Sequence, residues 1–201
     1  VNHHANMAHA KSVIALKELW PEAKVGASFA YSPSYAIDNK PENAMAKADY
    51  DDLKNYYWMD VYAYGRYPRA ALAYLEANGV APVFEEGDNA IMKEAAQLVD
   101  FMGVNYYQTT TVEFNDIDGV GTSHEMNTTG KKGTAKVQGV PGLYKNPQNA
   151  NLPTTDWDWT IDPMGIRMCC REITSRYDLP IVISENGLGA FDMLEDGEVH
   201  D

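Results

Sequence analysis

The sequence predicts an α/β fold in which short buried strands alternate with helices, and two observations support that prediction. Three apolar runs have the length of strands, and the segments between them contain stretches with helical periodicity. The three runs are residues 24–31, 101–107 and 180–184. Strands separated by helices form parallel βαβ units. The pattern alone leaves open whether the sheet closes into a barrel or stays open and doubly wound.

Helices are expected between these runs. Residues 2–20 have helical spacing, and Pro21 ends that helix. Its small and apolar face is expected to comprise Ala5, Ala8, Ser12, Ala15, Leu16 and Leu19. Further helices are expected over residues 42–63, 68–77 and 88–99. Asp88 is a plausible N-cap for the last of these, and Pro163 opens one more helix because proline suits the first helical position.

Two stretches show no sustained period. Residues 108–155 are rich in Gly, Thr, Asn and Pro, and a structureless stretch of that length is uncommon unless it is a functional loop or disordered. The tail from residue 191 to residue 201 is acidic and predicts a loop.

Composition and charge argue against several kinds of partner. The formal net charge is −13, so neither nucleic acid nor an anionic membrane is expected to bind. No signal peptide is evident, and no apolar run approaches the roughly 18 residues of a membrane span. Cys169 and Cys170 are adjacent and cannot close a long loop, so we expect two reduced thiols in a helix of a cytoplasmic protein. His3, His4 and His9 do not share one helix face, and no metal site is expected.

Polar side chains follow the predicted strands at their carboxyl ends, where parallel α/β folds form active sites. Asn105 and Tyr107 are two residues apart on the second strand and therefore point to the same side. Glu185 ends the third strand, where a carboxylate is costly to bury without hydrogen-bond partners, and Tyr107 could supply one such bond. Glu185 is therefore a functional candidate, with a helix-capping or salt-bridge role as the alternative.

Five segments resemble glycoside hydrolase family 1, in order along nearly the whole chain. Residues 180–187 read Pro-Ile-Val-Ile-Ser-Glu-Asn-Gly and resemble the nucleophile strand of that family, an aliphatic run that ends in Glu-Asn-Gly. Residues 3–10 resemble the helix after the family's fourth strand, and residues 100–107 resemble its sixth strand. Residues 65–68 resemble its Gly-x-Tyr-Pro turn, and residues 159–166 its Trp-x-x-x-Pro-x-Gly-Leu segment.

The resemblance implies a fold and a mechanism. It implies that residues 1–201 form a single incomplete glycosidase domain, a partial (β/α)₈ TIM barrel with about strands five to seven and their helices. It implies retaining β-glycoside hydrolysis without a cofactor, in which Glu185 forms a covalent glycosyl-enzyme. In that mechanism Tyr107 orients the nucleophile through a hydrogen bond and keeps it ionised. Trp159 would line the aglycone side of the cleft, and Asn105 would shape the base of the pocket.

The sequence departs from the family pattern at two points. The family's acid/base glutamate lies in an Asn-Glu-Pro at the end of the fourth strand, and this tripeptide does not occur in residues 1–201. We therefore expect this chain, taken alone as an interior fragment, to be inactive. Ser184 stands where the family usually has Thr or Val, which is a minor change.

The segment after Glu185 resembles one subgroup of the family. Residues 187–192 read Gly-Leu-Gly-Ala-Phe-Asp and resemble the Gly-x-Gly-Ala-x-Asp of bacterial 6-phospho-β-glucosidases. The expected activity is therefore that of a 6-phospho-β-glucosidase, whose substrate is a small 6-phosphorylated β-glucoside. A plain β-glucosidase and a 6-phospho-β-galactosidase are the alternatives. Another barrel enzyme, such as an isomerase or an aldolase, is a further alternative. Such an enzyme would require a lysine or a metal cluster at the strand ends, and neither appears in the sequence. A non-catalytic sugar-binding or scaffold relative is the alternative from a different class.

A partial barrel should also expose strand edges. The first and third of the predicted strands would each lack a neighbour on one side, which invites pairing with another copy of the chain.

Overall fold

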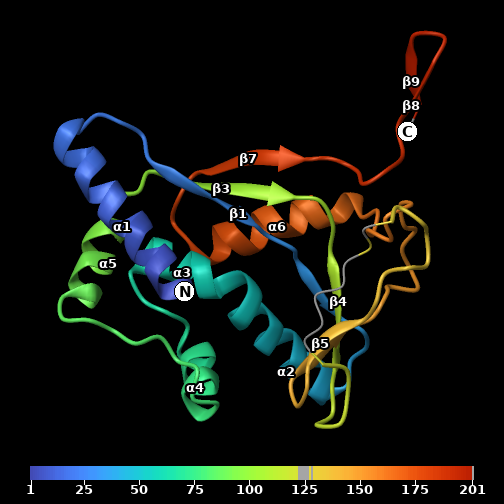
Figure 1. Ribbon diagram of the computed structural model, residues 1–201, viewed down its shortest axis with the longest axis horizontal. Coiled ribbons are helices and arrows are strands. Elements are labelled where there is room, and N and C mark those ends of the chain that lie inside the picture. The colour runs from blue at the N-terminus through green and yellow to red at the C-terminus, as the bar shows by residue number, and fades with distance from the viewer. Residues whose placement is uncertain (122–126, 128, 201) are drawn as a thin grey trace. The chain divides into compact units, whose positions relative to one another are not determined.

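The computed structural model describes residues 1–121, 127 and 129–200 (Figure 1). The chain divides into two compact units. The first comprises residues 1–31, 51–105 and 170–184, and the second comprises residues 32–50, 106–169 and 185–201. The single incomplete domain expected over residues 1–201 stays a prediction.

Three strands form a sheet whose greater part belongs to the first unit. They are β1 (Gly26–Ala30), β3 (Phe101–Tyr106) and β7 (Ile181–Asn186), and their order is β1-β3-β7. β1 and β3 are parallel, and β7 runs in the same direction as β3 (Figure 1). The three strands predicted from the sequence are therefore confirmed. β1 and β7 are the outer strands, and the pairing with another copy that their edges suggest stays a prediction.

The central and outer strands of this sheet differ in burial. In β3, Met102 and Val104 are fully buried, as expected for a strand with neighbours on both sides. In β7, Val182 and Ile183 remain 45% and 40% exposed. The prediction that residues 180–184 form a buried strand is therefore right in type and wrong in burial, because among the described residues this strand has a neighbouring strand on one side only.

The predicted helices are present, with one interruption. Residues 41–64 form α2 (Pro41–Tyr50), the π-helix η1 (Asp51–Tyr56) and α3 (Tyr57–Tyr64). The remaining helices are α1 (Asn2–Leu19), α4 (Arg69–Ala77), α5 (Asp88–Ala96) and α6 (Pro163–Arg176). α6 carries Cys169 and Cys170 as thiols, and Cys169 is buried. No helix in the described part of the chain is both long and apolar enough to cross a bilayer.

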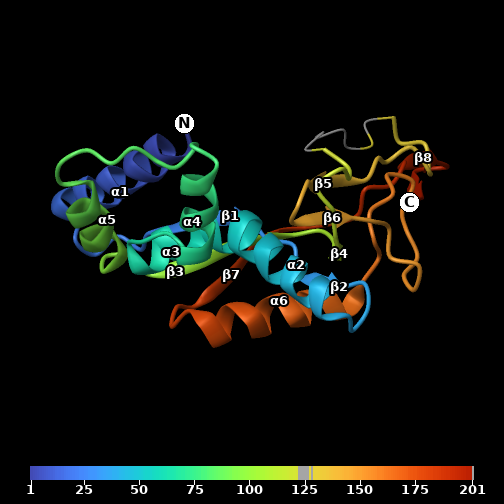
Figure 2. The ribbon, with the colours of Figure 1, turned by 90° about the horizontal axis from the view of Figure 1, so that it is seen from below.

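α1 buries a different face from the one that its apolar residues predict. The residues expected to share a packed face are all exposed, and Leu19 is 87% exposed. The buried residues are His3, Met7, Ala10 and Val13. Met7 joins a core cluster with Met92, and Ala10 joins one with Ala95, so this face packs on α5. The two helices lie side by side in both ribbon views (Figures 1 and 2).

Hydrogen bonds explain why a histidine lies on the buried face of α1. His3 Nδ1 lies 2.9 Å from Tyr67 Oη, and His3 Nε2 lies 2.9 Å from Asp88 Oδ2. Asp88 also accepts a hydrogen bond from the backbone N–H of Glu85 at 2.8 Å. Asp88 is the first residue of α5, and the N-cap residue of this helix is Gly87. The prediction that Asp88 is the N-cap is therefore wrong. Its carboxylate binds α1 instead.

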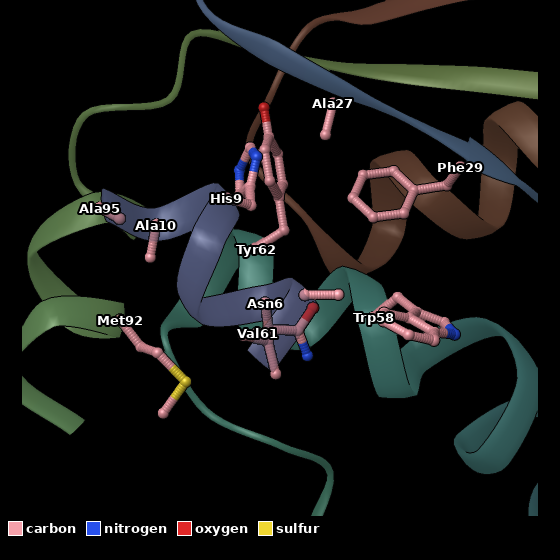
Figure 3. Close-up of a pocket in the computed structure, with 11 residues that line it drawn as sticks. Asn6, His9, Ala10, Ala27, Phe29, Trp58, Val61, Tyr62, Met92 and Ala95 are labelled. Carbon is pink, nitrogen blue, oxygen red and sulfur yellow. The ribbon is translucent and has the colours of Figure 1, made fainter. Parts of the chain in front are cut away.

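A cavity of about 220 Å³ lies within the first unit (Figure 3). His9 and Tyr62 line it with ring centroids 5.3 Å apart, and Phe29 and Trp58 contribute further aromatic wall. The Nε2 atom of His9 is buried without a hydrogen-bond partner among the described residues. Burial lowers the pKa of His9, which favours the neutral imidazole. None of the predicted site residues lines this cavity.

The second unit contains strands that the aperiodic sequence does not predict. They are β2 (Ser34–Ala36), β4 (Thr110–Phe114), β5 (Gln138–Val140) and β6 (Tyr144–Asn146), in the order β2-β4-β6-β5. β2 and β4 are parallel, and the other two pairs are antiparallel. The tail expected as a loop contains a hairpin of β8 (Met193–Glu195) and β9 (Glu198–His200). Five of the six strands named here are three residues long, too short to show a period of two.

A buried carboxylate joins α3 to α6 within the first unit. Asp60 accepts hydrogen bonds from Arg176 Nε at 2.8 Å, from Arg176 Nη2 at 2.6 Å and from Tyr177 Oη at 2.6 Å. Asp60 is buried, so its charge depends on these donors in place of water.

We expect Arg176→Gln to lower the free energy of unfolding by about 2 kcal/mol, the scale of hydrogen bonds to charged groups. The matched control is Arg171→Gln, which removes an exposed arginine from the same helix and should change stability by less than about 0.5 kcal/mol. Urea unfolding followed by circular dichroism measures both. Equal effects of the two substitutions would contradict this account of Asp60.

Candidate active site

Glu185 and Tyr107 come together at the ends of two strands. Glu185 is the penultimate residue of β7, and Tyr107 directly follows β3. Tyr107 Oη donates a hydrogen bond of 2.7 Å to Glu185 Oε2, the contact expected from the sequence. Both residues are exposed, so the Glu185 carboxylate does not bear the cost of burial that the end of a buried strand would impose. The carboxylate is oriented by the phenol and remains open to solvent.

Trp159 stands beside this pair. The rings of Trp159 and Tyr107 have centroids 5.6 Å apart and meet edge to face at 61°. Gly189 approaches Trp159 so closely that an added Cβ would lie 2.9 Å from Cε3 of the indole. At Gly187 an added Cβ would lie 3.7 Å from the Tyr107 ring. Close packing against Trp159 therefore gives a physical reason for Gly189 in the Gly-Leu-Gly segment after the strand.

The strand ends are also tied by side-chain hydrogen bonds that the sequence does not predict. Asn186 Nδ2 donates a hydrogen bond of 2.8 Å to the carbonyl of Tyr106. Tyr106 Oη in turn donates one of 2.8 Å to the carbonyl of Asp162, which directly precedes α6. A Cβ on Gly165 would lie 1.9 Å from Tyr106 Oη, so a larger residue there would displace the phenol. Gly165 stands before Ile166 at the end of the segment 159–166. A glycine at that position is the sequence feature that could have indicated this close contact.

Asn105 belongs to the first unit, where the end of β3 lies between two serines. Asn105 Oδ1 accepts a hydrogen bond from Ser184 Oγ at 2.7 Å and one from Ser28 Oγ at 3.3 Å. The hydroxyls of Ser28 and Ser184 also hydrogen-bond to each other. Of the four predicted site residues, Glu185, Tyr107 and Trp159 are thus gathered in the second unit, and Asn105 is held by serines in the first.

The hydrogen bond to Glu185 affects the acidity of Tyr107. It raises the pKa of the Tyr107 phenol, with smaller contributions from desolvation and from the carboxylate charge. The cause is that a phenolate would lose the hydrogen bond and would face a second negative charge. An oriented, exposed carboxylate beside an aromatic face can act as a nucleophile or a base toward a small polar molecule that stacks on the ring.

We expect Glu185→Gln to lower the pKa of Tyr107, because the amide removes the negative charge that opposes phenolate formation. NMR titration of chain labelled with ¹³C at the tyrosine ring measures this shift, with Tyr107→Phe identifying the signal. The control is Glu195→Gln, an exposed carboxylate in β8, which should leave the Tyr107 titration unchanged. A Tyr107 signal that titrates identically in Glu185→Gln and in the parent chain would contradict the observed contact.

Known proteins are similar to this chain over nearly its whole length. Aryl-phospho-beta-D-glucosidase BglC of Bacillus subtilis is 48% identical over 200 residues, which are 100% of this chain and 41% of that protein. 6-phospho-beta-galactosidase 1 of Streptococcus pneumoniae is 35% identical over 98% of this chain and 42% of its own length. The chain therefore spans less than half the length of the curated relatives it matches.

Solved structures agree with this similarity. A β-glucosidase from Exiguobacterium marinum superposes with a TM-score of 0.76 at 27% identity, over 99% of this chain and 40% of that one. The β-glucosidase BglU from Micrococcus antarcticus gives a TM-score of 0.80 at 26% identity, over 99% and 42% of the two chains. The mixed α/β fold is thus that of part of a family-1 barrel. The sequence model of the family Glycosyl hydrolase family 1 matches residues 1–201, and the chain belongs to that family.

Proposed function

We propose that this chain is the nucleophile-bearing part of a retaining β-glycosidase and that it supplies about strands five to seven of a (β/α)₈ barrel. The hydrogen bond from Tyr107 to Glu185 carries the proposal, because it orients a solvent-accessible carboxylate at the carboxyl end of a parallel strand. That edge is where barrels of this kind build their active sites. Family membership and the Glu-Asn-Gly ending of β7 support the same assignment.

In the proposed reaction Glu185 attacks the anomeric carbon of a β-glycoside. The bond from that carbon to the glycosidic oxygen breaks while an ester to Glu185 forms, and the leaving oxygen takes a proton from a second carboxylic acid. Water then attacks the anomeric carbon and gives a proton to the second carboxylate, which restores that acid, releases Glu185 as a carboxylate and yields the free sugar. Tyr107 occupies one oxygen of Glu185 with its hydrogen bond, which leaves the other oxygen to attack.

The other two residues are proposed to bind substrate. Trp159 presents an indole edge-on to Tyr107 and would line the aglycone side of the cleft. Asn105 would shape the base of the sugar pocket. Its Oδ1 accepts hydrogen bonds from Ser184 and Ser28, so its amide nitrogen is directed by those contacts and remains a potential donor to a sugar hydroxyl.

A 6-phosphorylated β-glucoside is the substrate we favour. The 48% identical relative is named for aryl-phospho-β-glucosides, and the Gly-Leu-Gly-Ala-Phe-Asp segment after Glu185 has the pattern of that subgroup. A 6-phospho-β-galactoside is the second candidate, since a relative named for it is 35% identical. A plain β-glucoside is the third, and a non-catalytic role is the alternative from another class.

The test places residues 1–201 in a chimera, in exchange for the matching segment of BglC from Bacillus subtilis, which supplies the remainder of a barrel. We expect hydrolysis of an aryl β-D-glucoside 6-phosphate and much slower hydrolysis of the unphosphorylated glucoside. Glu185→Gln should lower kcat by at least roughly 10³-fold, as expected on losing a nucleophile. Glu195→Gln, which removes an exposed carboxylate nearby in sequence, is the matched control and should retain activity.

Different outcomes separate the alternatives. Preference for the galactoside 6-phosphate or for the plain glucoside would retain the glycosidase and replace the proposed substrate. A fully active Glu185→Gln would remove Glu185 from the mechanism. A correctly folded chimera that binds the sugar phosphate without hydrolysing it would favour the non-catalytic role.

A further inference from the structure

A tight turn carries the two tryptophans beside the candidate site. The N–H of Thr155 donates to the carbonyl of Trp159 at 2.9 Å, and the N–H of Asp158 donates to the carbonyl of Thr155 at 3.0 Å. Asp158 has a φ of 62°, in the left-handed region that residues other than glycine seldom occupy. Aspartate visits this region more readily than most residues because its short carboxylate can hydrogen-bond nearby backbone. The backbone between Trp157 and Trp159 therefore has a conformation that is unusual for a residue other than glycine.

The carboxylate of Asp158 is surrounded by donors from a distant loop. It accepts hydrogen bonds from the backbone N–H groups of Gly133 at 2.6 Å, Thr134 at 3.0 Å and Ala135 at 2.8 Å. Asn127 Nδ2 donates a fourth bond of 3.0 Å. Three consecutive amides that converge on one carboxylate fix the local course of the backbone, and charged hydrogen bonds are the stronger kind.

The same loop is held by hydrogen bonds to Asn127, and it packs near Trp157. Asn127 is buried, and its Oδ1 accepts the N–H groups of Thr129 and Gly130 at 3.0 and 3.1 Å. A Cβ on Gly130 would lie 2.4 Å from the ring of Phe191. Phe191 in turn lies beside Trp157, with ring centroids 6.0 Å apart. The loop residues 127 and 129–135 thus hold the tryptophan turn both through Asp158 and through Phe191.

Ionisation of Asp158 agrees with this arrangement. Partial desolvation raises its pKa, but the hydrogen bonds from the amides of Gly133 and Ala135, from Asn127 and from the amide of Thr134 outweigh it, and the net pKa is lowered. A lowered pKa in the folded chain means that the contacts stabilise the fold above the ordinary aspartate pKa, and that this contribution is lost as pH falls through the folded value.

We propose that Asp158 is a positioning residue: it ties residues 127 and 129–135 to the tryptophan turn and thereby fixes the position of the Trp159 ring against Tyr107, the residue that holds Glu185. The chain of contacts is continuous within the second unit, from the loop amides to Asp158, along the backbone to Trp159, and through the Tyr107 ring to the nucleophile. Its relevance to a sugar site rests on the proposed function, whereas the positioning itself concerns this chain alone.

The test uses the 201-residue chain with Asp158→Gly, which permits the left-handed backbone while removing the carboxylate. Asp158→Asn keeps the side-chain shape with one acceptor oxygen. The control is Asp196→Gly, at the other aspartate with positive φ, which is exposed in the β8–β9 turn. Two readouts are followed: the initial rate of tryptic cleavage after Lys131 and Lys132, and the NMR signals of the Trp159 indole N–H and the Tyr107 ring.

We expect Asp158→Gly to raise the cleavage rate at these lysines about tenfold or more and to shift both NMR signals. Asp158→Asn should give smaller changes in the same direction, and Asp196→Gly should give neither. The indole signals of Trp20 and Trp58, which belong to the first unit, report that the fold is intact. Should Asp158→Gly not fold, the Asn variant decides in its place.

Two results would overturn the proposal. Faster cleavage with unmoved Trp159 and Tyr107 signals would show that the carboxylate serves the loop alone. Unchanged cleavage together with unchanged signals would show that its hydrogen bonds do not hold the loop. Neither readout requires turnover, so the outcome for Asp158 is independent of whether the chain proves to be part of a glycosidase.

Discussion

Tyr107 and Glu185 lie 78 positions apart in the sequence and are joined by a hydrogen bond of 2.7 Å, and the features that surround the site all act on this pair. Asn186 fastens the end of β7 to the carbonyl of Tyr106, so the two side chains start from adjoining strand ends. Gly189 leaves room for Trp159, which packs edge-on against the phenol. An exposed carboxylate has many orientations available to it, and the chemistry proposed here requires one of them. The hydrogen bond supplies that constraint, and the neighbouring contacts hold the donor in place.

The sequence predicts those elements whose periodicity is sustained. β3 and α6 have clear apolar patterns over 6 and 14 residues, and both are found where expected. β2, β5 and β6 are three residues long and form through pairing with distant segments, so no local pattern reveals them. The face of α1 is mispredicted because counting apolar residues favours Leu16 and Leu19. The helix in fact buries His3, whose polarity is satisfied by Tyr67 and Asp88.

At the candidate site, too, some features follow from the local sequence and others depend on contacts between distant segments. The contact between Glu185 and Tyr107 follows from their places at strand ends, since parallel strands bring those ends together. The exposure of Glu185 does not follow, because it depends on how many neighbours β7 has. Asp158 carries no recognisable motif: its importance arises from a left-handed φ and from amides 23 to 25 positions away in the sequence. Such contacts become visible only when the backbone of the loop is known.

Covalent trapping of the glycosyl-enzyme tests the central claim, that Glu185 is the nucleophile. The chimera with BglC would be incubated with an activated 2-deoxy-2-fluoro-β-glucoside 6-phosphate, whose fluorine slows release of the sugar, and then digested for mass spectrometry. The account predicts one adduct with the mass of the fluorosugar phosphate on Glu185, absent from the Glu185→Gln variant. An adduct on a different carboxylate, or turnover of the reagent with no adduct at all, would contradict it.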